Sequence, residues 1–448
     1  MAVGLPGTRR ALRVAAKAAV LPFVAPWLVI VALGERADSR RRRRSGSKPR
    51  LAYGPVPIIA LKYMSQAMRG AGYETTTFVD DLYAINERSD FDRHRAEFFG
   101  RSLLGRLTSL LVGDYLVFAW MLRRHDVFHF FFDGGFLRHT PMRFAELRLL
   151  HLAGKRVVVM PYGSDVAIPS RIHSSEWRDS FLADYPRTAT DEPRRIRWVD
   201  EFTRHADYIV ACVVHFETLT RWDLLTIHYY PIDTDAWAPR FDDSGHDGRD
   251  GPVTVVHAPN HRAINRSASV IEACEALRAE GLQVELRLME KVPNTTVHAE
   301  VERADILVEQ LILGYGLSAI EGMSLARPVV GNLSDERYFG EAFRRQTRFG
   351  DCPIVSATPE TVRDELRRLV VDPELRRRIG AAGRAYVLRE HSYEAMARLW
   401  DAIYRRIWHG EQVDPARLLR PEGRDLTSGA PRPTAVEAPA GALRTAER

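Results

Sequence analysis

Residues 304–333, ADILVEQLILGYGLSAIEGMSLARPVVGNL, constrain the fold of this chain more than any other stretch. The pattern predicts a strand at 305–308, a glycine loop, a helix beginning near Leu317 and a second strand at 328–330. Gly314 and Gly316 permit a tight turn and the close approach of a ligand. The helix directs free N–H groups and its positive dipole end at that ligand, which suits a diphosphate. Glu321 lies one turn inside the helix, where it suits neighbouring sugar hydroxyls, so the unit predicts a nucleotide-diphosphate sugar site.

The same stretch resembles a known family. Retaining glycosyltransferases of the GT-B fold, glycosyltransferase family 4-like, carry the pattern G-x4-E-x-M-x4-P-V, which is matched here by Gly316, Glu321, Met323, Pro328 and Val329. The resemblance implies that Glu321 binds the ribose of the nucleotide and that the loop glycine lies against the donor. Many members have a second glutamate eight residues before the first, and that position is Leu313 here.

The polar loop after the strand that begins at Val253 supplies candidate cations. In the resembling family this loop carries an arginine and then a lysine, both on the donor diphosphate. Arg262 matches the arginine, Asn265 stands at the lysine position, and Arg266 follows it. Arg266 either replaces the lysine, since arginine chelates phosphate in bidentate fashion, or points to solvent. Arg262 is the predicted catalytic cation, because negative charge builds on the leaving diphosphate as the glycosidic bond breaks.

The N-terminal half contributes turns that the resemblance places beside the cleft. Gly54 follows the first strand, and Gly163, Ser164 and Asp165 follow a later one. Asp165 either binds acceptor hydroxyls or caps the next helix. Asp133, in FHFFFDGG, is the better cleft candidate of its run and is the second predicted catalytic residue. His129 is expected to be a core histidine.

Alternation of apolar strands with helical stretches predicts parallel sheets with crossover helices. The expected fold class is therefore α/β, and the resemblance implies GT-B: two Rossmann-like domains facing a central cleft, with a C-terminal helix that crosses back to the N-terminal domain. The expected organisation is listed from the N-terminus: a membrane-associating segment at 1–49, an acceptor domain at 50–239, a donor domain at 252–390, a crossover helix at 391–410 and a disordered tail at 411–448.

The N-terminal segment combines an apolar stretch with positive charge. Residues 18–34 are uncharged, basic residues precede them, and the heavier run Arg40–Arg44 follows. The heavier flank predicts that this side faces the cytoplasm, with an anionic membrane surface as partner. Spanning the membrane and lying on it both remain open, and the alternative is a disordered tail with an apolar patch. The expected location is the cytoplasmic membrane face or the cytoplasm.

The net charge of +6 does not predict a nucleic-acid partner, because Arg40–Arg44 is the only dense basic run and no RNA-binding signature or zinc-finger spacing accompanies it. No metal-binding pair stands out, and the resemblance implies a metal-independent enzyme without a cofactor. The sequence thus predicts a glycosyltransferase that moves a sugar with retention from a nucleotide sugar to a glycan or lipid-linked acceptor. The alternatives are a nonhydrolysing sugar-nucleotide epimerase and a catalytically weak scaffold subunit, which Leu313 and Asn265 favour.

Overall fold

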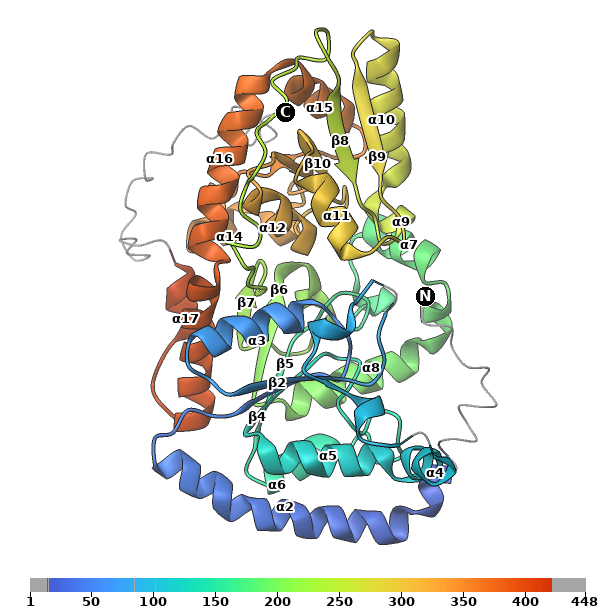
Figure 1. Ribbon diagram of the computed structural model, residues 1–448, viewed down its shortest axis with the longest axis vertical. Helices are drawn as coiled ribbons and strands as arrows, with labels where there is room; N and C mark the ends of the chain where they lie inside the picture. The colour runs from blue at the N-terminus through green and yellow to red at the C-terminus, as the bar shows by residue number, and fades with distance from the viewer. Residues whose placement is uncertain (1–13, 15, 84, 101, 421–448) are drawn as a thin grey trace.

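The computed structural model describes residues 14, 16–83, 85–100 and 102–420. Two α/β domains follow one another along the long axis of the molecule, the C-terminal domain at the top of the view and the N-terminal domain below it (Figure 1). Each domain is built around one parallel sheet. This is the predicted α/β class with two sheets, and it is confirmed.

The N-terminal domain holds a seven-stranded sheet of order β3-β2-β1-β4-β5-β6-β7 in the described residues, with every pair of neighbours parallel. Its central strands are buried along their whole length, because helices cover both faces of a parallel sheet. The strands are β1 (Leu51–Tyr53), β2 (Thr75–Val79), β3 (Arg93–His94), β4 (Val127–Phe130), β5 (Arg156–Val159), β6 (Tyr208–Cys212) and β7 (Leu224–Thr226). The helices are α3 (Ala60–Gly70), α4 (Leu103–Leu111), α5 (Gly113–Arg124), α6 (Glu146–Leu152), α7 (Ser175–Asp184) and α8 (Arg187–His205).

The C-terminal domain holds a five-stranded parallel sheet of order β12-β11-β10-β8-β9 within the described part of the chain. Its strands are β8 (Val253–His257), β9 (Val284–Leu288), β10 (Ile306–Val308), β11 (Val329–Gly331) and β12 (Val355–Ser356). Its helices are α9 (Arg262–Asn265), α10 (Ser267–Ala279), α11 (Asn294–Val301), α12 (Leu317–Ser324), α13 (Glu336–Phe339), α14 (Glu341–Gln346), α15 (Val362–Val371) and α16 (Pro373–Glu390).

The predicted crossover is helix α17 (Tyr393–Tyr404), which leaves the C-terminal domain and packs against α3 of the N-terminal domain. His129 Nδ1 donates to the carbonyl oxygen of Ala52 at 3.1 Å, and its Nε2 bonds Tyr404 OH at 2.9 Å. Burial lowers the pKa of His129 to about 3, so the ring is neutral and accepts the tyrosine proton. His129 is therefore the core histidine that was expected, and it fastens the crossover helix.

The N-terminal segment is not separate from the domain, which corrects the expected boundary at 49. Residues Leu21–Arg44 form one helix, α2, that packs on α5 and α6. Its inner face adds Val24, Leu28 and Val31 to the apolar core of the domain. The uncharged stretch is thus half buried by protein, because its apolar residues recur on both faces of the helix.

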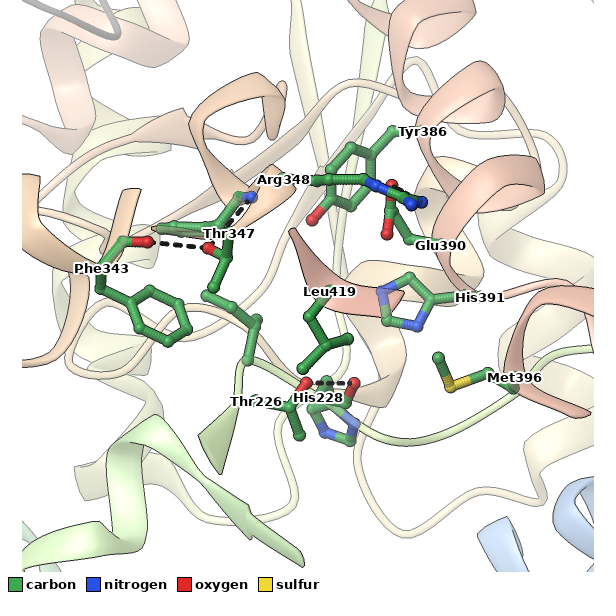
Figure 2. Close-up of a pocket in the computed structure, with 12 residues that line it drawn as sticks. Thr226, His228, Phe343, Thr347, Arg348, Tyr386, Glu390, His391, Met396 and Leu419 are labelled. Carbon is green, nitrogen blue, oxygen red and sulfur yellow. Dashed lines mark hydrogen bonds and ion pairs between the residues drawn. The ribbon is translucent and has the colours of Figure 1, made fainter. Parts of the chain in front are cut away.

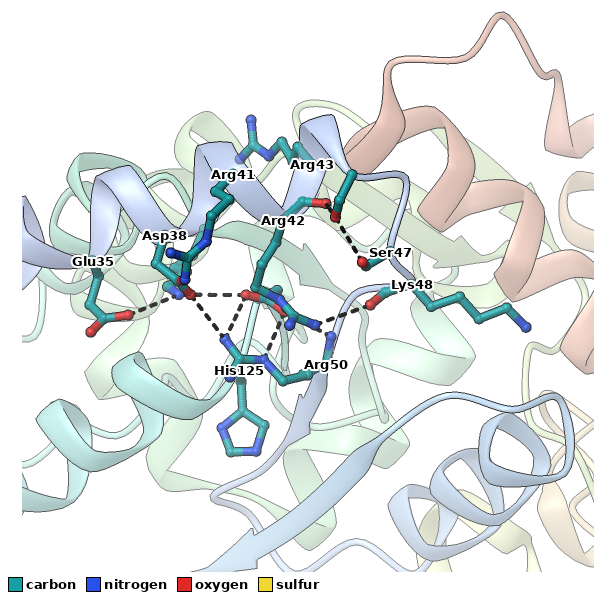
Figure 3. A network of polar contacts seen from close by, with 12 residues as sticks. Glu35, Asp38, Arg41, Arg42, Arg43, Ser47, Lys48, Arg50 and His125 are labelled. Carbon is teal, nitrogen blue, oxygen red and sulfur yellow. Dashed lines mark hydrogen bonds and ion pairs between the residues drawn. The ribbon is translucent and has the colours of Figure 1, made fainter.

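The last turns of α2 are held by a buried ionic cluster (Figure 3). Asp126 accepts from Arg42 Nε at 3.0 Å and from Arg50 Nε and Nη2 at 3.0 and 3.1 Å. Lys155 lies 3.6 Å from the same carboxylate. The bonds from Arg50 outweigh the effect of burial and lower the pKa of Asp126. Part of the basic run therefore points into the protein and does not face solvent.

Among the described residues, no single helix has the length and apolar composition to cross a bilayer; α4 and α5 reach them only as a pair bent by 74°. At the other end, the structure corrects the expected disorder for residues 411–420. Pro415–Leu419 form a 3₁₀ turn that packs on β7 and α17, because Ala416 and Leu419 find apolar neighbours there. Residues 421–448 of the predicted tail lie outside the described residues, as do 1–13 and 15.

Candidate functional site

The predicted strand–loop–helix unit forms as β10, the loop 309–316 and α12. Gly314 packs so closely on β11 that an added Cβ would lie 2.0 Å from the backbone nitrogen of Asn332. Gly316 is the N-cap residue of α12, and Leu317 is the first residue of the helix. Close packing thus requires glycine at position 314, whereas a Cβ at Gly316 would meet only the carboxylate of Glu309, at 3.0 Å. The first turn of α12 begins directly after this loop.

The side chain of Glu309, directly after β10, lies at the start of α12. This is the place where the sequence predicts a diphosphate. The carboxylate of Glu309 accepts the backbone N–H of Gly316 at 2.7 Å and the hydroxyl of Ser318 at 2.9 Å. Burial raises the pKa of Glu309 to about 7. Without a ligand, then, a glutamate side chain satisfies the free N–H at the start of α12. Glu309 lies four positions before Leu313, which is the position of the second glutamate in the family pattern. Alignment with that pattern therefore does not single out Glu309.

Glu321 lies in the second turn of α12 and is 6% exposed. Asn294 is within hydrogen-bonding reach of its carboxyl group, yet its Oε1 has no partner in the described part of the chain. Burial, together with the charge of Glu309, raises the pKa of Glu321 to about 8. A buried acceptor without a partner costs free energy, so this oxygen is suited to receive hydroxyls from a bound ligand.

The two candidate cations are engaged in ion pairs rather than turned toward α12. Arg262 is exposed and donates from Nε and Nη2 to Glu290 at 2.8 and 2.6 Å. Arg266 has a left-handed backbone (φ 55°) and donates to Glu176 of α7, across the domain boundary, at 3.0 Å. Both arginines are in the expected loop, and in this state each is neutralised by a carboxylate.

On the N-terminal side, the turn after β5 meets the turn after β4. Asp165 is buried and accepts backbone N–H groups from Phe132, Tyr162 and Gly163 at 2.9–3.0 Å. Burial and the charge of Asp133 raise the pKa of Asp165. Asp165 therefore neither binds an acceptor freely nor caps a helix: it holds the two turns together.

Two other predicted cleft residues have distinct roles. Asp133 is exposed at this strand end and accepts a hydrogen bond from the Tyr162 hydroxyl. Gly54 lies against β2, where a Cβ would be 2.1 Å from the carbonyl oxygen of Phe78, so glycine is required there by packing. Of the N-terminal candidates, Asp133 is exposed and Ser164 is half-buried, so both keep part of their surface open to solvent.

The two halves of the site meet at contacts that the sequence did not indicate. Tyr185 OH and His261 Nε2 share a hydrogen bond of 2.6 Å, and Asp184 accepts the N–H of Ile264 at 2.9 Å. Tyr185 is also within hydrogen-bonding reach of Ser164. The end of α7 thus lies on the loop that carries Arg262 and Arg266. The sequence shows a polar loop after β8 and an aromatic residue after α7. It contains no signal that these two segments are in contact.

The glycine loop is also joined to the crossover segment. Tyr315 OH bonds His391 Nε2 at 2.6 Å, and His391 Nδ1 donates to the carbonyl oxygen of Tyr230. His391 borders a cavity of about 30 Å³ between β7, α14 and the junction of α16 with α17 (Figure 2). A ligand pocket needs roughly 300 Å³ or more, so this cavity has room for water and not for a nucleotide sugar.

No three His, Cys, Asp or Glu side chains gather as metal ligands within residues 14, 16–83, 85–100 and 102–420. Metal-independent catalysis stays a prediction.

Comparison with known proteins agrees with this architecture. Residues 320–402 match the profile of a glycosyl transferase-like family. The matched residues include Glu321 and most of the crossover helix α17. No curated protein sequence matches the chain significantly. Among solved structures, an alpha-glucosyltransferase in complex with UDP-glucose and DNA containing an abasic site is 10% identical, with 80% of this chain and 99% of that one covered and a TM-score of 0.51.

Two further similar structures have lower scores. HepE of Anabaena in complex with UDP-glucose is 14% identical, over 78% of this chain and 97% of that one, with a TM-score of 0.48. A Thermobaculum terrenum O-GlcNAc transferase is 15% identical, over 83% and 68% of the two chains, with a TM-score of 0.46. At such identities the likeness concerns the fold alone. The two-domain arrangement with a crossover helix is that of GT-B glycosyltransferases.

Proposed function

We propose that this protein is a glycosyltransferase that moves a sugar, with retention and without a metal ion, from a nucleotide-diphosphate donor to a glycan or lipid-linked acceptor. The observation that carries the proposal is the buried Glu321, which follows a glycine loop at the start of a helix and whose Oε1 has no partner among the residues that the structure describes. The family profile that matches residues 320–402 supports it. UDP-sugars are the first donors to test, because the alpha-glucosyltransferase of similar fold was solved with UDP-glucose.

Transfer of a sugar from a nucleotide diphosphate requires the protein to hold the nucleotide and to stabilise the leaving diphosphate. Hydroxyls of the nucleotide replace the missing partner of Glu321, and a cation meets the charge that grows on the diphosphate as its bond to the sugar breaks. Arg262 supplies that cation once it leaves Glu290, with Arg266 as a second. Glu309 must give up the Gly316 N–H if the diphosphate is to reach the first turn of α12. Donor binding therefore rearranges the loop 309–316.

Incubation of the purified protein with UDP-, GDP- and ADP-sugars, with and without glycan, lipid-linked or DNA acceptors, tests the proposal. Transfer, or slow hydrolysis of the donor, supports it, and an isomerised donor shows an epimerase instead. Nucleotide binding without turnover identifies the scaffold alternative, which the occupied start of α12 also favours.

Calorimetry with Glu321→Ala then tests the site. We expect donor affinity to fall by ~1–3 kcal/mol, because the variant leaves the buried hydroxyls of the nucleotide without an acceptor. Glu272→Ala, on the exposed face of α10, is the matched control and should bind as the wild type does. Equal affinity of both variants for every nucleotide would refute the assignment of Glu321.

A further inference from the structure

Helix α2 carries an outer face that the domain does not cover. Successive outward positions at spacings of three and four residues are all exposed: Phe23, Pro26, Ile30, Leu33, Ala37, Arg40 and Arg44. The three large apolar side chains are 80%, 68% and 49% exposed. The outer stripe is thus apolar along the first half of the helix and basic along the second.

A second apolar surface adjoins the start of this helix. Leu103 and Leu104 of α4 are each 75% exposed. Helix α4 runs directly into α5, whose Asp114 is paired with Lys17 and whose Tyr115 donates to the Lys17 carbonyl oxygen at 3.3 Å. Figure 1 places α4 beside the N-terminal end of α2, at the pole of the molecule opposite the C-terminal domain. The two apolar surfaces therefore lie close together and away from the second domain.

The arginines of α2 divide by direction. Arg42 pairs with the buried Asp126, and Arg43 stacks over the ring of Trp408 at 4.5 Å. Arg40 and Arg44 form no ion pair with any residue that the structure describes. The inward arginines anchor the helix, and the outward pair is left for a partner with negative charge.

We propose that the outer face of α2, with the exposed leucines of α4, is a docking surface for an anionic lipid bilayer. Apolar side chains of an interfacial helix enter the boundary between headgroups and acyl chains, and arginines next to them meet lipid phosphates. A second copy fits less well, because two α2 helices packed antiparallel would set Arg40 and Arg44 against apolar side chains. This proposal does not depend on the transferase activity.

Sedimentation of the full-length protein with vesicles tests the surface. We expect binding to phosphatidylcholine–phosphatidylglycerol vesicles, weaker binding to phosphatidylcholine alone, and loss at high salt of the part that the charges supply. Ile30→Glu with Leu33→Glu should weaken binding about a hundredfold or more, since two apolar side chains no longer leave water. Arg40→Gln with Arg44→Gln should weaken it about thirtyfold on anionic vesicles only.

The matched control lies on α16 of the other domain, where Leu388 is 45% exposed and Arg378 is exposed. Leu388→Glu with Arg378→Gln should bind vesicles as the wild type does. All variants should melt at the wild-type temperature, because every changed residue is exposed. Equal vesicle binding by the α2 variants and the wild type overturns the proposal. So does a wild-type dimer that Ile30→Glu with Leu33→Glu converts to a monomer in light scattering, because α2 would then be a contact between copies.

Discussion

At the scale of single residues, the loop 309–316 and helix α12 contain two buried carboxyl groups. The pKa of Glu309 is raised to about 7 and that of Glu321 to about 8, both by burial first of all. A glutamate whose pKa is higher in the folded than in the unfolded state keeps a proton that the unfolded chain has lost. Each group therefore lowers the free energy of unfolding as the pH rises from about 4.5 toward its folded pKa.

Glu309→Gln should remove this pH dependence at its position. The amide oxygen still accepts from Gly316, and the amide nitrogen donates to Ser318, so the loop keeps both contacts. We expect equal stability near pH 5 and a variant more stable by about 1–3 kcal/mol near pH 8. Urea unfolding at both pH values measures this. A variant less stable at the higher pH would show that an ionised Glu309 supports the start of α12.

Arg262 tests whether a cation now bound to Glu290 takes part in the reaction. Arg262→Ala should leave the stability almost unchanged, because the pair with Glu290 is exposed. Turnover at saturating donor should fall about a hundred- to a thousandfold if the side chain stabilises charge in the transition state. Glu290→Gln, which frees the arginine, should keep or raise turnover. If Arg262→Ala alters only the Michaelis constant, the arginine binds the ground state and does not lower the barrier.

At the scale of elements, one buried carboxylate holds the last turns of α2 on the domain. Asp126→Ala leaves Arg42, Arg50 and Lys155 close together without their shared anion. Removing one partner from a buried ionic cluster costs ~3–5 kcal/mol, so the unfolding midpoint in urea should drop markedly. Asp38→Ala removes a half-buried carboxylate that pairs with the exposed Arg41 and lies 3.8 Å from Arg50, and it should cost at most about 1 kcal/mol. Similar effects of the two changes would show that the cluster does not hold the helix.

The same element explains why residues 1–49 cannot be treated as a removable anchor. Deleting them would take Val24, Leu28 and Val31 out of the core of the N-terminal domain. Vesicle binding is for this reason tested with point changes on the outer face.

At the scale of the whole molecule, α17 joins the two domains. Its buried side chains include Leu399, Trp400, Ile403 and Tyr404, which belong to the core shared with β1 and α3. A chain that ends at Glu390 should aggregate or unfold at a much lower temperature, because that apolar surface of the N-terminal domain becomes exposed. A chain that ends at Arg420 keeps every described element and is the control. Differential scanning calorimetry of both decides it, and equal melting would show that the domains do not need the crossover.

The local units of this protein were determined by its sequence. Periodicity and turn residues predicted the β10–loop–α12 unit, the parallel strands and the burial of His129, because those signals depend on neighbours a few residues apart. The family resemblance added the crossover helix, which is confirmed, and the role of Glu321, which stays a prediction. What each charged group binds was decided by the tertiary structure. Arg262 forms an ion pair with Glu290, Arg266 with Glu176 and Arg42 with Asp126. The two members of each pair are distant in sequence and become neighbours only in the folded chain.

The N-terminal stretch shows the same division. Seventeen uncharged residues with basic residues before and after them indicate burial of an apolar surface, but composition alone does not say whether lipid or protein covers it. In the folded protein, one face of α2 is covered by the N-terminal domain and the opposite face is exposed. Val24 and Leu28 meet α5 and α6, while Phe23 and Ile30, one and two residues away in sequence, point outward. The direction of a side chain on a helix depends on which domain surface the helix meets, and that surface exists only once the chain has folded.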